Sequence, residues 1–335
     1  MKLKIIFSET RAFFSALTLL LGSTFCSMAQ TEKQESSPKQ LVDALHSAFG
    51  DHHARAVHAK GIILLGTFTP SPVASTISKA PHFQGKTVPV IVRYSDFTGI
   101  PNISDADGLA NPRGMAIKFQ LPDGSSTDIV SHSFDGFPTA TSDEFRELLM
   151  AISRSGPDAV KPTELDKFLG GHPIAKTFLT TQNPAPVSYA TTSYFGVNAF
   201  KFTNKQGKSQ FIRYQFIPEE GEKYLSADET AKADKNYLQI EIPERVAQKS
   251  IKFKMYAQIA EDGDKVEDPS IAWGKNRKKV LLGTIEVKQM ASNTVASDKS
   301  LFFIPNNLPA GIAPADPMID FRSTAYPISV KERRE

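Results

Sequence analysis

The sequence predicts an α+β protein built around an eight-stranded antiparallel β-barrel, with helices inserted between the strands and flanking them. Apolar, β-rich runs recur in two sets of four, and the chain between the two sets changes to helical spacing. Eight antiparallel strands can close on themselves, and closure removes both exposed edges of the sheet. A sandwich of two sheets is the competing architecture.

The N-terminal segment has the pattern of a secretory signal peptide. Basic residues precede an apolar run at residues 12–21, and Ser27-Met-Ala29 gives the small-x-small pattern of a cleavage site. A membrane anchor needs about 20 consecutive apolar residues, which this run does not reach. We expect residues 1–29 to be removed, residues 30–37 to form a flexible leader, and residues 38–335 to form one domain. The protein is then exported, to the periplasm, with no stable membrane anchor.

The cysteine count and the net charge indicate which compartments and partners suit the protein. Cys26 is the only cysteine, so the expected mature chain has no thiol to form a disulfide or to be oxidised by peroxide. Cleavage removes three basic residues and one acidic residue, which lowers the formal net charge from +3 to +1. This balance predicts no nucleic acid as a partner, and the basic run at residues 275–279 carries no aromatic side chains for stacking on bases.

Helix signals lie before, between and after the two sets of strands. Ser37 as N-cap, Pro38 at the first helical position and Gly50 as terminator predict a short amphipathic helix. A capping box at residues 141–144 begins a second helix, and more helix is expected within residues 162–179. A proline-rich irregular segment and a short helical stretch follow the last strand.

The expected strands are separated by clusters of proline and glycine. They comprise residues 61–68, 88–95, 114–121 and 127–133 in the first set, and residues 195–203, 210–217, 251–259 and 280–287 in the second.

Short motifs recur along these elements in a fixed order. They are Arg55-x-x-His58-Ala-Lys-Gly61, Val92-Arg-Tyr-Ser95, Asn111-Pro-Arg-Gly114, Asp128-Ile-Val130, Asp268-Pro-Ser-x-x-Trp273, Pro305-Asn-Asn-x-Pro-x-Gly-Ile312 and Arg322-x-x-x-Tyr326-Pro. In order and spacing they resemble the motifs of haem catalases, and in particular those of short catalase-related peroxidases that contain little more than the barrel. The resemblance covers residues 50–334.

The resemblance implies that the chain binds haem, of the b type, with Tyr326 as the proximal ligand of the iron and His58 as the distal base. Phenolate is a hard anionic donor that suits ferric iron. A free tyrosine loses its proton only at about pH 10, so a nearby cation helps, and Arg322 lies one helical turn before Tyr326. Ser95 matches the hydroxyl that fixes the tautomer of the distal histidine.

The same resemblance assigns the edge and walls of the haem site. Arg55, Arg93 and Arg333 match three arginines that bind the haem propionates, and a guanidinium fork suits a carboxylate. Phe137 and Phe145 match aromatic residues packed against the haem. Ordinary core phenylalanines would be buried in the same way.

The chain departs from full-length catalases at several points. His132 stands where those enzymes carry a distal asparagine, and we expect a ring whose charge varies with pH. Ile328-Ser329 replaces the usual Asp-Thr after the proximal tyrosine, which removes part of a polar surrounding. The chain ends at Glu335 without the C-terminal helical domain, so we expect a less buried access route that admits organic reductants.

These observations favour an exported haem peroxidase that reduces hydrogen peroxide or organic peroxides with a small organic donor, with residual catalase activity. A fatty-acid hydroperoxide isomerase or synthase on the same barrel is one alternative. A non-enzymatic haem carrier or sensor is another, although a carrier has no need of a distal base such as His58 beside Ser95.

Overall fold

The eight predicted strands are present in the computed structural model, which describes residues 36–292 and 294–335. The expected signal peptide and most of the expected leader lie outside the described residues. The strands are β1 (Gly61–Pro70), β2 (Val88–Ser95), β3 (Gly114–Gln120), β4 (Ser126–His132), β5 (Tyr194–Thr203), β6 (Ser209–Pro218), β7 (Ile251–Ile259), β8 (Lys279–Met290) and the three-residue β9 (Ile312–Pro314).

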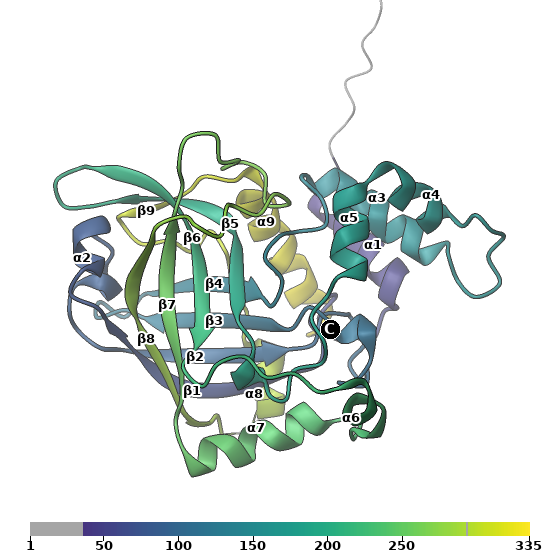
Figure 1. Cartoon of the computed structure of the whole chain (residues 1–335), viewed down its shortest axis with the longest axis horizontal. Coiled ribbons are helices and arrows are strands. Elements are labelled where there is room, and N and C mark those ends of the chain that lie inside the picture. The colour runs from purple at the N-terminus through teal and green to yellow at the C-terminus, as the bar shows by residue number, and fades with distance from the viewer. Residues whose placement is uncertain (1–35, 293) are drawn as a thin grey trace, which may run out of the picture. The chain divides into compact units, whose positions relative to one another are not determined.

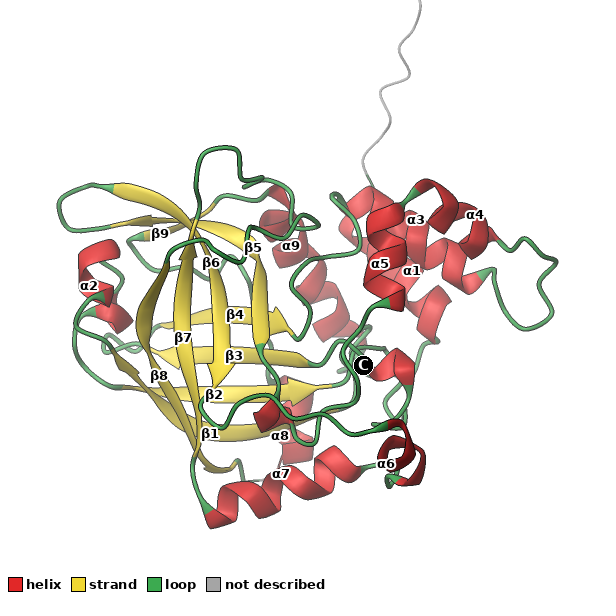
Figure 2. Cartoon of the chain, in the orientation of Figure 1, coloured by secondary structure: helices red, strands yellow, loops and turns green. Residues whose placement is uncertain are grey.

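The strands close into an antiparallel barrel (Figures 1 and 2). Their order is β4-β3-β2-β1-β8-β7-β6-β5, and β4 pairs with β5 through His132 and Phe195, which joins the two ends of the sheet. The predicted barrel is therefore confirmed, and the alternative of a two-sheet sandwich is wrong. The additional strand β9 pairs with β5 at residues 200–202.

The barrel interior is packed with aromatic rings. Side chains alternate along each strand, so every second residue points inward and loses its contact with water. The largest fully buried rings carried by the strands are Phe68, Tyr94, Phe119, Tyr194, Phe202, Tyr214, Phe216 and Phe253. This interior leaves the outer face of the barrel as the surface on which a site can be built.

The helices cover parts of the barrel and form a group beside it (Figure 1). They are α1 (Pro38–Phe49), α2 (Ala74–Ile77), α3 (Ser142–Ser153), α4 (Glu164–Gly171), α5 (Pro173–Thr180), α6 (Ala227–Lys232), α7 (Tyr237–Gln248), α8 (Thr294–Ser300) and α9 (Pro317–Glu332). Ser37 caps α1 as predicted, in a capping box with Gln40. At α3 only half of the predicted capping box is present, since Thr141 accepts from the N–H of Glu144 but the Glu144 carboxylate accepts from the N–H of Ala140. Helix α1 packs against α3 and α9. Within the described residues no helix is long and apolar enough to span a bilayer.

His82 is a titratable residue buried inside the barrel. It packs against Phe68, Phe83 and Phe119, and neither ring nitrogen has a hydrogen-bond partner among the described residues. Burial lowers the pKa of His82 to about 3, because the charged imidazolium would lose its hydration there.

We predict that this histidine makes folding sensitive to acid. In the unfolded chain His82 takes up a proton near its ordinary pKa of 6.5, and in the folded chain only near 3. Between these values the unfolded chain binds more protons, so stability is complete above pH 6.5 and falls as the pH falls below it. The slope is about 1.4 kcal/mol per pH unit. Replacement His82→Phe should flatten the pH dependence of the free energy of unfolding by that slope.

Denaturant titrations at a series of pH values between about 7.5 and 5 measure this slope. The exposed His52 provides the control, since His52→Phe should leave the pH dependence as it is in the parent. An unaltered slope in His82→Phe would show that His82 is protonated or solvated in the folded chain.

Candidate functional site

The candidate site is built on the outer face of β2, β3 and β4. Tyr94 and Met115 point into the barrel core, so their neighbours along the strands point outward. Ser95, Gly114 and His132 are paired in register and form one row across the three strands. Because His132 also closes the barrel, the position of this row is fixed by the hydrogen bonds of the barrel itself.

Helices α1, α3 and α9 contribute to a cavity over this face, with about 180 Å³ open to the centres of water molecules. All ten predicted site residues line the cavity. They are Arg55, His58, Arg93, Ser95, His132, Phe137, Phe145, Arg322, Tyr326 and Arg333. The rings of Phe137 and Phe145 lie 4.9 Å apart between centroids, and much of the remaining wall is apolar.

His58 is held by hydrogen bonds at its Nδ1 atom. This atom lies 3.0 Å from the carbonyl oxygen of Asp96 and 3.1 Å from Oγ of Ser95. Because a carbonyl can only accept, Nδ1 carries the hydrogen and Nε2 keeps a free lone pair. Burial, His132 and Arg93 lower the pKa of His58 to about 3, so the ring is neutral near pH 7.

The backbone at His58 is also fixed. Its φ of 57° lies in the left-handed region, which few residues with a side chain adopt. The N–H of His58 donates to the carbonyl of Phe97 at 2.7 Å, and the N–H of Ala59 donates to Thr98 at 2.9 Å. The ring of Phe97 packs edge-on against the imidazole, 5.5 Å away between centroids. Surrounding contacts thus hold a strained residue in one orientation.

His132 is a neutral hydrogen-bond donor. The N–H of Phe134 donates to Nδ1 of His132 at 3.3 Å, so the ring hydrogen resides on Nε2. Nε2 is buried and has no hydrogen-bond partner among the described residues. Burial and Arg322 lower the pKa of His132 to about 3. The expectation of a charge that varies near neutral pH is therefore wrong, because burial keeps this ring uncharged.

Tyr326 and Arg322 lie one turn apart on α9 and both line the cavity. Nε of Arg322 donates to the phenol oxygen of Tyr326 at 3.0 Å, and Nη2 donates to the same oxygen. Nη1 donates to Asn198, which donates to Asp316 at 2.7 Å. This chain of bonds fixes the guanidinium, which directs two N–H groups at the phenol oxygen.

Ser329 connects α9 with the segment that carries His58. Its Oγ accepts from the backbone N–H of Ala56 at 3.2 Å, while Ile328 packs against the cluster formed by α1 and α3. The replacement of Asp-Thr by Ile328-Ser329 thus leaves a polar contact at one of the two positions.

The three predicted arginines surround residues 298–301. Nη2 of Arg55 and Nη2 of Arg333 both donate to the carbonyl of Leu301 at 2.7 Å, and Arg93 pairs with the carboxylate of Asp298. Burial and Arg93 lower the pKa of Arg55 to about 9, and burial lowers the pKa of Arg333 to about 10. Arg55 and Arg333 therefore remain cations near pH 7.

Two motif glycines leave room for functional side chains. A Cβ atom at Gly61 would lie 2.4 Å from the guanidinium carbon of Arg93. At Gly114 a Cβ would lie 2.5 Å from Oγ of Ser95 and 2.7 Å from Nδ1 of His58. Any larger residue at these positions would displace the groups that face the cavity.

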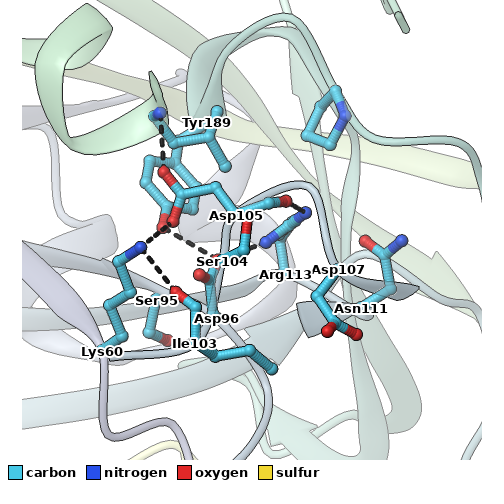
Figure 3. Close-up of polar contacts among 12 residues, drawn as sticks. Lys60, Ser95, Asp96, Ile103, Ser104, Asp105, Asp107, Asn111, Arg113 and Tyr189 are labelled. Carbon is cyan, nitrogen blue, oxygen red and sulfur yellow. Dashed lines mark hydrogen bonds and ion pairs between the residues drawn. The ribbon is translucent and has the colours of Figure 1, made fainter. Parts of the chain in front are cut away.

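A buried network of charges surrounds the side chain of Asp96 (Figure 3). Arg113 pairs with the carboxylate of Asp96, and Tyr189 donates to the same carboxylate at 3.0 Å. Nζ of Lys60 lies 2.5 Å from the carboxylate of Asp105, whose carbonyl oxygen accepts from Arg113. Burial, opposed by Arg113 and reinforced by Asp105, raises the pKa of Asp96 to about 7. The network anchors the residue whose carbonyl fixes His58.

Sequence reasoning missed four contributors to the site. Asp316 had a local signal, because an aspartate directly before a proline is typical of a helix start, and its side chain caps α9. Asp96 follows Ser95 in a motif, but nothing in the motif reveals its partners. Asn198 and Asp298 act across long sequence separations and leave no local pattern.

The family model described as Catalase matches residues 48–334 of this chain. The catalase-related peroxidase of Mycolicibacterium paratuberculosis is 36% identical over 302 residues, which cover 89% of this chain and 95% of that protein. The catalase-related peroxidase of Synechococcus elongatus is 34% identical over 304 residues, with coverage of 89% and 88%. The catalase of Vibrio vulnificus is 27% identical, and the match covers 81% of this chain but only 56% of that protein.

Solved catalases share the fold. A bacterial catalase superposes with a TM-score of 0.75 at 21% identity, covering 97% of this chain and 67% of that chain. A fungal catalase gives a TM-score of 0.74 at 21% identity, covering 84% and 59%. At these identities the likeness to solved structures establishes the fold alone. The family match over residues 48–334 and the relatives at 36% and 34% identity show that the chain belongs to the catalase family.

Proposed function

We propose that this chain is an exported, haem-dependent peroxidase that reduces hydrogen peroxide or organic peroxides with a small organic donor and retains some catalase activity. Its likeness to catalase-related peroxidases over nearly the whole of both chains makes it an oxidoreductase that acts on peroxide. The observation that carries the haem-dependent mechanism is the presence, around one cavity, of a phenol oxygen and a histidine with its tautomer fixed.

The residues around the cavity fit haem. The phenol oxygen of Tyr326 accepts a hydrogen bond from the Arg322 guanidinium. A phenolate oxygen is a donor suited to ferric iron. His132 lines the cavity, and its buried Nε2–H has no hydrogen-bond partner among the described residues. Buried polar groups are normally hydrogen-bonded, so this N–H is suited to bind a ligand. Three arginines line the cavity with guanidinium groups of the kind that bind carboxylates, and Phe137 and Phe145 supply aromatic wall. When bound, haem would supply the iron at which peroxide is reduced.

The proposed roles follow from the atoms that each residue leaves available. Nε2 of His58 takes the proton from the peroxide and returns it to the departing oxygen. Nε2–H of His132 donates a hydrogen bond that orients the peroxide. Tyr326 would hold the iron through its phenol oxygen, to which Nε and Nη2 of Arg322 already donate hydrogen bonds. A ring with a fixed tautomer favours turnover over the alternative of a carrier.

Tyr326→Phe is predicted to remove the iron ligand while keeping the shape of the cavity. The purified variant should bind much less haem and should lack the phenolate-type ferric absorption spectrum, because phenylalanine has no oxygen to offer. Tyr256→Phe, a matched change on β7 outside the cavity lining, should keep both properties. Equal haem content and an identical spectrum in Tyr326→Phe would assign the iron to another residue.

The two cavity histidines are predicted to differ in how strongly they affect the reaction with peroxide. His58→Ala should slow this reaction by about 10²-fold to 10⁴-fold, the usual contribution of a proton shuttle. His132→Ala loses a hydrogen bond worth about 0.5 to 1.5 kcal/mol, or roughly a factor of 2 to 13. His132→Asn restores an amide donor and should keep peroxidase turnover, with a higher ratio of oxygen release to donor oxidation.

Stopped-flow absorbance after mixing with hydrogen peroxide measures these rates, and an oxygen electrode measures the ratio. The exposed His52 again supplies a control, because His52→Ala should react like the parent. A crippled His132→Ala beside a fully reactive His58→Ala would reverse the two assignments.

Export is predicted from the basic start, apolar run and small-x-small site of the N-terminal segment. The mature protein should begin at or near Gln30 and should be recovered from an extracytoplasmic fraction. N-terminal sequencing of the protein produced from the full-length gene checks this outcome. Recovery of a chain that starts at Met1 in a membrane or cytoplasmic fraction would rule out the signal peptide.

A further inference from the structure

The arginines at the cavity already have an anionic partner within the chain. Nε and Nη2 of Arg93 donate to the two carboxylate oxygens of Asp298 on α8, and Nη2 of Arg55 lies 3.2 Å from the same carboxylate. Arg333 donates to the carbonyl of Lys299 at 3.1 Å and to that of Leu301. Within the described part of the chain, the arginines line the cavity and Asp298 does not.

Asp298 therefore contacts the cluster from the side of α8. Its side chain is 26% exposed, whereas those of Arg93 and Arg55 are 4% and 12% exposed. Burial opposes ionisation of Asp298, but Arg93 and Arg55 outweigh burial and hold its pKa below the usual value. The carboxylate is charged near pH 7, and its negative charge compensates the largely buried cations of Arg93 and Arg55.

Three guanidinium groups and one carboxylate leave a net charge of +2 on this cluster. Without Asp298 the empty protein would hold three buried cations with only backbone carbonyls as partners, which is strongly destabilising. We propose that Asp298 is the internal counter-ion of the arginine cluster. Its carboxylate stabilises the protein before the cofactor binds, and it leaves the cluster with a net charge of +2, which matches a ligand with two carboxylates. This inference rests on the proposed function, since haem is such a ligand.

The counter-ion has opposite effects on the empty and the loaded protein. Asp298→Asn keeps the shape of the side chain and removes its charge, so the empty variant should unfold at a lower temperature than the parent. In this variant the ligand carboxylates would neutralise Arg93 and Arg55, which no longer have the Asp298 carboxylate as a partner. The variant should therefore gain affinity for a dicarboxylate porphyrin, by about 5-fold to 150-fold, the range typical of coupling between groups that share partners.

A pair of ligands separates this charge effect from damage to the cavity. Haemin has two free carboxylates, and haemin dimethyl ester has none. Trp273, the only tryptophan, reports binding by quenching of its fluorescence when the empty full-length mature chain is titrated with each ligand. The ratio of ester to haemin dissociation constants should rise in Asp298→Asn relative to the parent. Asp228→Asn, a matched change at an exposed residue of α6, should leave this ratio and the melting temperature unaltered.

A second variant keeps the test decisive if Asp298→Asn folds poorly. In Arg55→Gln/Asp298→Asn one cation is lost together with the anion, so the empty protein should recover part of the lost melting temperature. Asp298→Glu keeps the negative charge, so this variant should keep the melting temperature of the parent. An empty Asp298→Asn that melts like the parent, or a ratio that falls, would overturn the inference. A parent chain that binds neither porphyrin would refute the proposed function, while the melting temperatures would still decide the role of Asp298.

Discussion

The contact between His58 and the carbonyl of Asp96 is the interaction on which the rest of the site depends. It exists because the segment around His58 is paired with residues 96–98, and because Arg113 and Tyr189 anchor the buried side chain of Asp96. A carbonyl that can only accept leaves the second ring nitrogen free for the cavity. The state of His58 at the cavity therefore depends on the carbonyl of Asp96 and on the buried ion pair between Asp96 and Arg113.

The two cavity histidines illustrate how neighbours give identical side chains different properties. The carbonyl of Asp96 forces the hydrogen of His58 onto Nδ1, whereas the N–H of Phe134 forces that of His132 onto Nε2. Burial keeps both rings neutral. One ring thus presents an acceptor and the other a donor, and a peroxide between them would find a base and a hydrogen bond without any change of protonation beforehand.

The sequence was sufficient for the barrel because each strand carries its own signal. Alternation and flanking turns are local, as are the caps at Ser37 and Thr141. Strand β9 has three residues, and α7 contains Pro243, so neither has a clear pattern. In the site, motif matching placed all ten residues around one cavity, but it missed Asp298, which meets Arg93 across 205 residues of sequence. Such pairs arise from tertiary packing alone, and burial similarly decided the charge of His132.

Helix α9 connects the two sides of the cavity. Tyr326 and Arg322 face the cavity from one turn, Ser329 bonds the backbone at Ala56, and Arg333 reaches the residues that follow α8. These positions recur at helical spacing, so one helix carries the proposed iron ligand, its cation and a proposed propionate partner. A shift of α9 would move all of them together and would also pull on the segment that holds the distal base. The separation between the proposed ligand and the proposed base therefore depends on the packing of α9 against α1 and on its hydrogen bonds to Asn198 and to the backbone of Ala56.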